Sequence, residues 1–235
     1  MQIKPQWREP LAEAGLDSFD ALMTFEAGRC FSWHKRGQAY RVELPGGRAV
    51  FLKRDARTKL KDIFGDCVRL QRPQPRTFKE RWAAERLAEL GIATPQIIAW
   101  GQKRRAGLPW QAVIVSTCLP GRPLDEYLAS GIDPAGRRAT LAAVGSVIAK
   151  LYEAGLSWPD LLPKHVFISP QREVGLIDLE RMHPCRSALV RRMPAQVRRF
   201  CRLLQEGGVA EAELDVLLHA LGYEDLVDYD ASAGT

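Results

Sequence analysis

Two aspartates in the C-terminal half, Asp160 and Asp178, have a spacing that suits phosphoryl transfer. Residues 166–168 and 174–177 are apolar and are predicted to form two strands, joined by the turn-forming residues 169–173. Pairing these strands brings the proline-bearing loop of Asp160 close to the strand end that carries Asp178. One carboxylate then orients an attacking hydroxyl, and the other holds the magnesium ion that bridges nucleotide phosphates. A turn aspartate and a strand-end aspartate are each common alone, but the ordered pair favours this chemistry.

A lysine and a glutamate farther upstream supply two more groups that such chemistry needs. Lys53 ends the apolar run 49–53, like the strand lysine that pairs with nucleotide phosphates. Residues 77–90 have a helical pattern that ends at Gly91. Glu80 lies at the head of the apolar stripe of this helix, and a glutamate there is costly unless a cation meets it. We therefore expect Lys53 to pair with Glu80, and we expect solvated positions for Glu85 and Glu89.

Five segments carry a resemblance to a known family. They are Phe51-Leu52-Lys53, residues 80–95, Leu119-Pro120-Gly121, the Pro163-Lys164-His165 tripeptide before an apolar strand, and Ile177-Asp178-Leu179-Glu180. With these segments, the chain resembles the Kdo/WaaP lipopolysaccharide kinase family, from about residue 10 to about residue 205. That family is a bacterial branch of the protein-kinase-like fold.

The resemblance implies a fold, a reaction and a set of site residues. The fold is α+β and two-lobed, with a β-rich N-terminal lobe at residues 1–116 and a helical C-terminal lobe at residues 117–235. The reaction is transfer of phosphate from ATP, with Mg²⁺, to heptose or Kdo in the lipopolysaccharide inner core. By position, the site residues are the catalytic Asp160, the phosphate-binding Lys53, its partner Glu80 and the metal-binding Asp178.

Three departures from the general kinase pattern concern the same loops. Trp158-Pro159-Asp160 stands where His-Arg-Asp is usual, so different packing must hold the loop. His165 takes the place of an asparagine that binds a second metal, although neutral imidazole suits magnesium poorly. We expect His165 to contact Asp160 or a nucleotide phosphate, or to leave a one-metal site; a buried structural histidine is the alternative. Leu179-Glu180 replaces Phe-Gly, which predicts a metal loop fixed in one state.

The remaining pattern predicts the elements that position these residues. A helix is expected over Pro10–Thr24 and another, buried, over Arg137–Glu153. A connection between the lobes, where an adenine would meet backbone groups, is expected at residues 117–121. The expected strands, apart from those flanking Asp160 and Asp178, are 31–42, 49–53, 96–100 and 111–116, with a turn at Pro45-Gly46-Gly47.

Length, cysteines and hydropathy limit the classes of protein. The 235 residues can bury a large core, and no run of about eighteen apolar residues is present to span a membrane. The first residues lack the apolar core of a signal peptide. The five cysteines have no metal-like spacing and are expected to be free thiols in a cytoplasmic protein.

The net charge of +6 is unevenly distributed. Residues 181–205 contain seven arginines and no acid, whereas the chain beyond them is acidic. An apolar stripe at Val197, Phe200, Cys201 and Leu204 predicts an amphipathic helix with Arg198, Arg199 and Arg202 on its outer face. Such a face is either simply solvated or attracted to anionic sugars, phosphates or the inner surface of the bacterial inner membrane.

Three classes of function follow from these observations. The favoured class is an ATP-dependent kinase with a lipopolysaccharide core precursor as acceptor. The second is a catalytically weakened kinase-like binding or regulatory module, suggested by Trp158, His165 and Glu180. The third is a basic nucleic-acid-binding protein, which is disfavoured because no aromatic residues interleave with the arginines, so no nucleic acid is expected as a partner.

Overall fold

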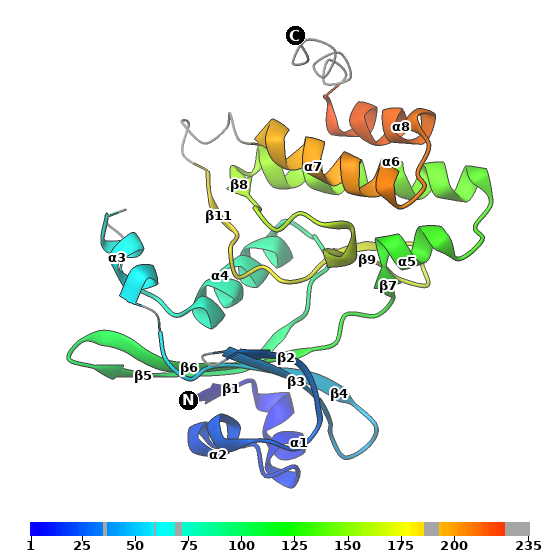
Figure 1. Ribbon diagram of the computed structural model, residues 1–235. Coiled ribbons are helices and arrows are strands. Elements are labelled where there is room, and N and C mark those ends of the chain that lie inside the picture. Colours follow the sequence, from blue (N-terminus) through cyan, green and yellow to red (C-terminus); the bar gives the residue numbers. More distant parts are fainter. Residues whose placement is uncertain (35–36, 59, 69–71, 186–192, 224–235) are drawn as a thin grey trace. The chain divides into compact units, whose positions relative to one another are not determined.

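The computed structural model describes residues 1–34, 37–58, 60–68, 72–185 and 193–223 (Figure 1). The chain divides into two compact units. The first contains Met1–Glu85 and Pro95–Cys118, and the second contains Arg86–Thr94 and Leu119–Thr235. The segment Arg86–Thr94, which precedes Pro95–Cys118 of the first unit in the chain, groups with the second unit. The division into lobes at residues 1–116 and 117–235 remains a prediction.

The first unit is built on one six-stranded antiparallel sheet. Its strand order is β1-β5-β6-β4-β3-β2. Along β4, buried Val50, Leu52 and Arg54 alternate with half-buried residues, so Lys53 projects from the opposite face to Leu52. The strands are β1 (Gln2–Ile3), β2 (Arg29–His34), β3 (Gly37–Glu43), β4 (Ala49–Asp55), β5 (Ile97–Arg105) and β6 (Leu108–Thr117).

Two short helices, α1 (Arg8–Glu13) and α2 (Phe19–Thr24), cover one face of this sheet (Figure 1). The predicted single helix over Pro10–Thr24 is wrong. Gly15 adopts φ +68°, and the Leu16 amide closes α1 by donating to the Leu11 carbonyl at 2.7 Å. Ser18 then caps α2 by accepting from the Ala21 amide. The core between helices and sheet consists of Leu11, Leu16, Leu22, Tyr40, Val42, Leu44, Val50, Leu52, Ile98, Ala99, Val113 and Val115.

Two further helices follow β4. The helix expected at residues 77–90 is present as α4 (Arg76–Glu89) and ends before Gly91, which has φ +66°. The helix α3 (Leu60–Val68) was not expected from the sequence. Phe64 and Val68 of α3 are 70% and 66% exposed, so these two apolar side chains do not pack into a core.

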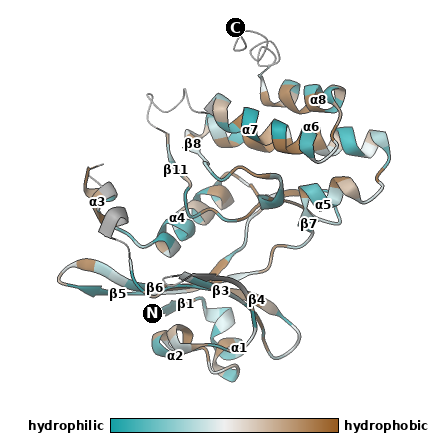
Figure 2. Ribbon diagram, viewed as in Figure 1, coloured by the Kyte–Doolittle hydropathy of each residue, from teal (hydrophilic) through white to brown (hydrophobic). Residues whose placement is uncertain are grey.

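The second unit is mainly helical, with α5 (Leu124–Ala129), α6 (Pro134–Glu153), α7 (Met193–Glu206) and α8 (Glu211–Leu221). Asp133 caps α6 by accepting from the Ala135 and Gly136 amides. A Cβ atom on Gly145 would lie 2.4 Å from the Leu217 carbonyl oxygen, so a glycine is needed where α6 meets α8. Hydrophobic and hydrophilic bands alternate along these helices (Figure 2), as expected for helices buried on one side.

Short strands connect the helices to the loops of interest. β9 (Val166–Ile168) and β10 (Val174–Leu176) form the expected antiparallel hairpin, and β7 (Arg122–Pro123) adds to β9. Gly121 has φ +111°, and a Cβ atom there would lie 2.2 Å from the Ile168 carbonyl oxygen. β8 (Leu156–Ser157) pairs with β11 (His183–Pro184), and the 3₁₀-helix η2 (Pro163–His165) leads into β9.

Each of the five cysteines is a thiol outside any disulfide, as expected. Among the described residues, no helix is long and apolar enough to cross a membrane.

Candidate active site

The ion pair expected between Lys53 and Glu80 is present. Lys53 Nζ lies 2.7 Å from Glu80 Oε1, and the two side chains are 27% and 10% exposed. Glu85 and Glu89 of the same helix are exposed, as predicted, and form surface pairs with Arg81 and Arg86. The charge of Lys53 thus compensates the burial of the Glu80 carboxylate. That Lys53 and Glu80 serve to bind a nucleotide stays a prediction.

A second contact sets the register of α4 on β4. The amide and hydroxyl of Thr77 both donate to Asp55 Oδ2 at 3.2 Å. Asp55 follows Lys53 by two residues on one strand face, and Thr77 precedes Glu80 by three residues on one helix face. The Asp55–Thr77 contact therefore holds Glu80 opposite Lys53. Sequence reasoning missed Asp55, although its spacing from Lys53 was a usable signal.

Trp158 links the loop of Asp160 to the loop of Asp178. Its side chain is 1% exposed, and its indole Nε1–H donates to the Asp178 carbonyl oxygen at 3.3 Å. Asp178 itself has φ +58°, a left-handed conformation that is costly for a residue with a Cβ atom. In place of the usual His-Arg-Asp arrangement, the buried indole of Trp158 therefore anchors the loop of Asp178 by a hydrogen bond to the Asp178 backbone.

His165 contacts both aspartates. Its Nδ1 lies 2.8 Å from the Asp160 carbonyl oxygen, and its Nε2 lies 3.5 Å from Asp178 Oδ2. Because a carbonyl only accepts, Nδ1 must carry a hydrogen. Nε2, the other ring nitrogen, faces a carboxylate oxygen of Asp178. The expected contact with Asp160 is thus present through its backbone, and a phosphate contact stays a prediction.

The donor set around Asp178 fits magnesium. The Asp178 side chain is 39% exposed, so a carboxylate oxygen is accessible to an ion. Mg²⁺ is usually held by one or two carboxylates, with phosphate oxygens and water completing its octahedron. Within the described ranges, no cluster of three or more His, Cys, Asp or Glu side chains forms a metal cage. A single ion on Asp178, completed by nucleotide phosphates, is the arrangement that these residues fit.

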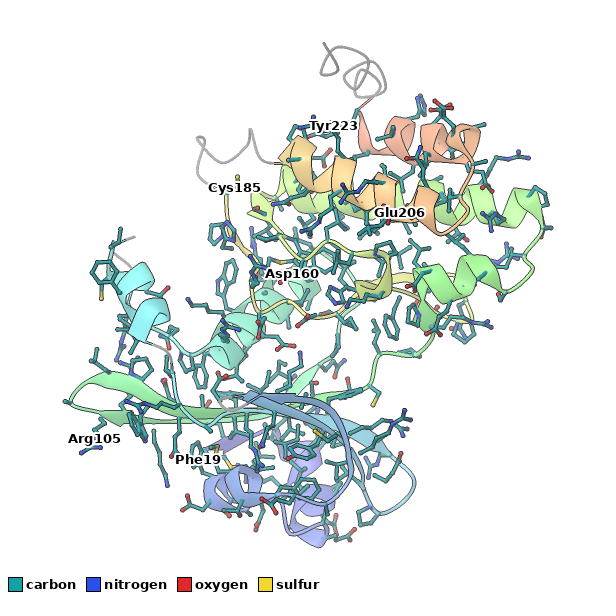
Figure 3. All side chains as sticks on the ribbon, in the orientation of Figure 1. Phe19, Arg105, Asp160, Cys185, Glu206 and Tyr223 are labelled. Atoms are coloured by element: carbon teal, nitrogen blue, oxygen red, sulfur yellow. The ribbon has the colours of Figure 1, made fainter. Side chains whose placement is uncertain are left out.

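Arg181 holds the carboxylate of Asp160, which lies on the loop between β8 and η2 (Figure 3). Arg181 Nη1 is 2.7 Å from Asp160 Oδ1, and the side chains are 59% and 16% exposed. Because Arg181 follows Asp178 by three residues, the loops of Asp178 and Asp160 are joined by a charge-assisted hydrogen bond as well as by Trp158.

Arg199 departs from the sequence prediction. It was expected on the outer face of α7 together with Arg198 and Arg202, and this is wrong for Arg199. Its side chain is half-buried, and its Nη2 donates to the carbonyl oxygen of Pro159, while Arg198 and Arg202 are exposed. Position 199 precedes the fully buried Phe200, so it lies at the edge of the apolar stripe rather than opposite it. Arg186, Arg191, Arg192 and the acidic residues beyond Tyr223 lie outside the described residues.

Comparisons with known proteins agree with this geometry. A family model described as the lipopolysaccharide kinase (Kdo/WaaP) family matches residues 32–219. The lipopolysaccharide core heptose(I) kinase WaaP of Escherichia coli strain K12 is 27% identical, with 74% of this chain and 70% of that protein covered. A second protein with the same description, from Escherichia coli, is 26% identical with the same coverage.

A solved structure points to the same fold. It is described as WaaP in complex with acyl carrier protein and has a TM-score of 0.72 at 19% identity, covering 96% of this chain and 90% of that chain. At this identity the match speaks for the fold alone, and it confirms the predicted protein-kinase-like architecture. Because the family model spans most of the sequence, the catalytic class is confirmed as well: the chain is a phosphotransferase and belongs to the lipopolysaccharide kinase (Kdo/WaaP) family.

Proposed function

We propose that the chain transfers phosphate from ATP to a sugar of the lipopolysaccharide inner core, with heptose rather than Kdo as the preferred acceptor. The family supports the reaction class, and the descriptions of the two Escherichia coli relatives favour heptose. The observation that carries the proposal is the position of His165, which contacts the Asp160 backbone at 2.8 Å and the Asp178 carboxylate at 3.5 Å. His165 thus links the loops that carry the two carboxylates that phosphoryl transfer requires.

Each site residue has a distinct part in the proposed reaction. Asp160 orients the sugar hydroxyl and accepts its proton as the bond to phosphorus forms. Lys53, kept in place by Glu80, binds nucleotide phosphate oxygens. Asp178 would hold Mg²⁺, which neutralises charge on the phosphates. Arg181 donates to Oδ1 of Asp160 and so orients the carboxylate. The second carboxylate oxygen, Oδ2, then receives the hydroxyl proton.

Substitution of the two aspartates tests these parts separately. Asp160→Asn should abolish phosphate transfer and leave nucleotide binding largely intact, because it removes a proton acceptor and no phosphate contact. Asp178→Asn should also weaken Mg²⁺-dependent nucleotide binding. Asp215→Asn, on the exposed face of α8, is the matched control and should change neither. An Asp160→Asn protein as active as the parent would remove the proposed mechanism.

The acceptor is identified by offering both sugars. Purified protein, ATP and Mg²⁺ are incubated with core precursors that end either in heptose or in Kdo, and the products are read by mass spectrometry. A gain of one phosphate on the heptose-bearing precursor supports the proposal. Phosphate on Kdo alone would correct the acceptor while leaving the reaction class in place. In cells, core oligosaccharide with and without the gene should differ by the same phosphate.

A catalytically weakened binding module is the second candidate, and the four paired residues argue against it. Lys53, Glu80, Asp160 and Asp178 are all retained, and their contacts are formed. A thermal-shift assay with ATP and Mg²⁺ separates the two: a module without nucleotide affinity gains no stability, whereas a ligand at 100 times its Kd adds about 2.7 kcal/mol.

The lipid-linked acceptor implies a place of action at the inner face of the bacterial inner membrane. An exposed surface on α3 suits peripheral docking there, with Phe64 70% and Val68 66% exposed one helical turn apart. The chain from Lys53 to Arg81, which includes α3, is rich in Lys and Arg. Apolar insertion with basic flanks is the pattern of proteins that lie on an anionic bilayer.

A further inference from the structure

The loop around Asp160, residues 158–162, belongs to neither helix nor strand, so its carbonyl groups need partners outside regular ladders. Three find them within the loop and η2. The Trp158 carbonyl accepts from the Leu161 amide at 3.2 Å, and the Leu162 carbonyl accepts from the His165 amide at 2.9 Å. The Asp160 carbonyl accepts from His165 Nδ1 at 2.8 Å. The carbonyls on either side of Asp160 remain.

One guanidinium serves both of these carbonyls. Nη2 of Arg199 donates to the Pro159 carbonyl oxygen and makes a longer contact of 3.5 Å with the Leu161 carbonyl oxygen. Pro159 has no amide hydrogen, so the loop has one backbone hydrogen-bond donor fewer at this point. The N–H groups of Nη2 point in directions fixed by the guanidinium plane, whereas the ammonium of lysine is a rotatable point charge.

The base of Arg199 is fixed relative to the loop. Gln196, one helical turn earlier, donates from Nε2 to Ser157 Oγ at 3.0 Å and accepts from the Tyr152 hydroxyl at 3.3 Å. Next to Gln196 on the same helix, Val197, Phe200 and Leu204 are buried. Arg199 therefore reaches the loop from an anchored helix, whereas Arg202 is 69% exposed and its pair with Glu206 lies at 3.7 Å on the surface.

We propose that Arg199 is a positioning residue, which fixes the backbone on both sides of Asp160 and so sets the direction of the catalytic carboxylate. This inference rests on the role given to Asp160 in the proposed function. Arg199 touches no reacting atom and acts on Asp160 only through the backbone of the loop. Misplacing a reacting group by about 1 Å can lower a rate by about 100-fold, so a loosened loop should reduce the rate of transfer rather than nucleotide binding.

The kinetic test compares Arg199→Gln with three controls. Arg198→Gln and Arg202→Gln change the same residue type on the exposed part of α7. Arg137→Gln removes a contact with Glu213 away from the loop and supplies a variant of reduced stability. At a temperature well below every melting point, Arg199→Gln should lower kcat about 10- to 100-fold, with the KM for ATP within about twofold. The three controls should keep kcat within about twofold.

A lysine at position 199 completes the kinetic test. Arg199→Lys retains a cationic donor group without the fixed guanidinium plane and should restore part of the lost kcat, so it also serves if the glutamine variant does not fold. An unchanged kcat in Arg199→Gln, or a loss equal to that of Arg137→Gln, would assign Arg199 to general stability and overturn the inference.

Hydrogen exchange gives a readout that needs no substrate. In the full-length protein, the amides of Leu161 and His165 should exchange about tenfold faster in Arg199→Gln than in the parent, and at the parent rate in Arg198→Gln. Faster exchange in a protein inactive on both sugars would refute the proposed function while keeping the loop-holding role of Arg199. An active enzyme whose loop exchange is unchanged by Arg199→Gln would refute the inference alone.

Discussion

The indole Nε1 of Trp158 donates to the carbonyl oxygen of Asp178 at 3.3 Å, which joins the two loops that carry the proposed catalytic and metal-binding aspartates. Asp178 is held in a left-handed conformation at φ +58°. Because such a conformation persists only when the surroundings fix it, the bond from Trp158 is one reason that the carboxylate keeps its direction.

Two substitutions at Trp158 separate the donor from the ring. Trp158→Phe and Trp158→His each lose buried volume, and each should cost roughly 1–3 kcal/mol of stability. Only histidine keeps an N–H that can reach the Asp178 carbonyl. We expect Trp158→Phe to need a higher Mg²⁺ concentration for nucleotide binding than Trp158→His, measured by titration with a fluorescent ATP analogue. Equal Mg²⁺ requirements for the two variants would limit Trp158 to packing.

A double-mutant cycle tests the Lys53–Glu80 pair. Lys53→Met should raise the KM for ATP by roughly tenfold or more, because it removes a phosphate contact. Glu80→Gln should have a smaller effect of the same kind, and the double variant should resemble Lys53→Met, because Glu80 acts through Lys53. Glu85→Gln, on the exposed side of α4, is the control and should stay within about 0.5 kcal/mol in stability. Additive effects would mean that Glu80 serves ATP independently of Lys53.

Much of the site follows from local patterns in the sequence. The position of Glu80 at the head of an apolar stripe predicted both its burial and its pairing with Lys53, because a buried carboxylate needs a cation. The two short apolar runs around residue 170 predicted the hairpin of β9 and β10 that brings Asp178 near Asp160. These inferences succeed because the periodicity of one helix placed Glu80 on its buried face, and two consecutive strands defined the hairpin.

The contacts that the sequence did not reveal join residues far apart in the chain. Arg199 reaches Pro159 across forty positions, and nothing in the pattern of α7 distinguishes it from Arg198 until the packing of Phe200 is known. Trp158 was seen as a departure from the kinase pattern, yet its partner was not, although a buried indole N–H normally finds an acceptor. The break at Gly15 was missed because helical periodicity continues across it.

Stability in acid should depend on the pair formed by Arg137 of α6 and Glu213 of α8. Arg137 Nε and Nη2 lie 2.7 and 3.0 Å from the two carboxylate oxygens. The hydrogen bonds from Arg137 lower the pKa of Glu213 below its ordinary value of 4.5. A lowered pKa in the folded state contributes stability above the ordinary pKa, and this contribution is lost as the pH falls through the lowered value.

Glu213→Gln should therefore destabilise the protein by roughly 1–3 kcal/mol at pH 7. The difference from the parent should shrink as the pH falls below about 4.5, the ordinary glutamate pKa. Urea unfolding followed at several pH values measures this. A difference that stays constant down to about pH 3 would show that the charge of Glu213 does not contribute.

The free thiols should differ in reactivity. Cys30 and Cys67 are exposed. Burial raises the pKa of Cys201 to about 11 and also raises the pKa of Cys118 and Cys185. At about pH 8, an alkylating reagent should label Cys30 and Cys67 first, because the thiolate is the reactive form. Peptide mapping after timed quenching identifies the labelled residues, and rapid labelling of Cys201 would contradict the burial of α7.

The proposed membrane docking of α3 has a direct test. Phe64→Ser with Val68→Ser should lower binding to vesicles of phosphatidylethanolamine and phosphatidylglycerol at least about tenfold, since burial of a single large apolar side chain is worth roughly 1.5–3 kcal/mol. Arg198→Gln with Arg202→Gln tests α7 as the alternative surface and should change binding less, with an effect that salt suppresses. Vesicles should also protect Cys67, on the same helix, from alkylation while Cys30 stays reactive. Protection of neither thiol, together with unchanged vesicle binding in the α3 variant, would show that this helix does not face the membrane.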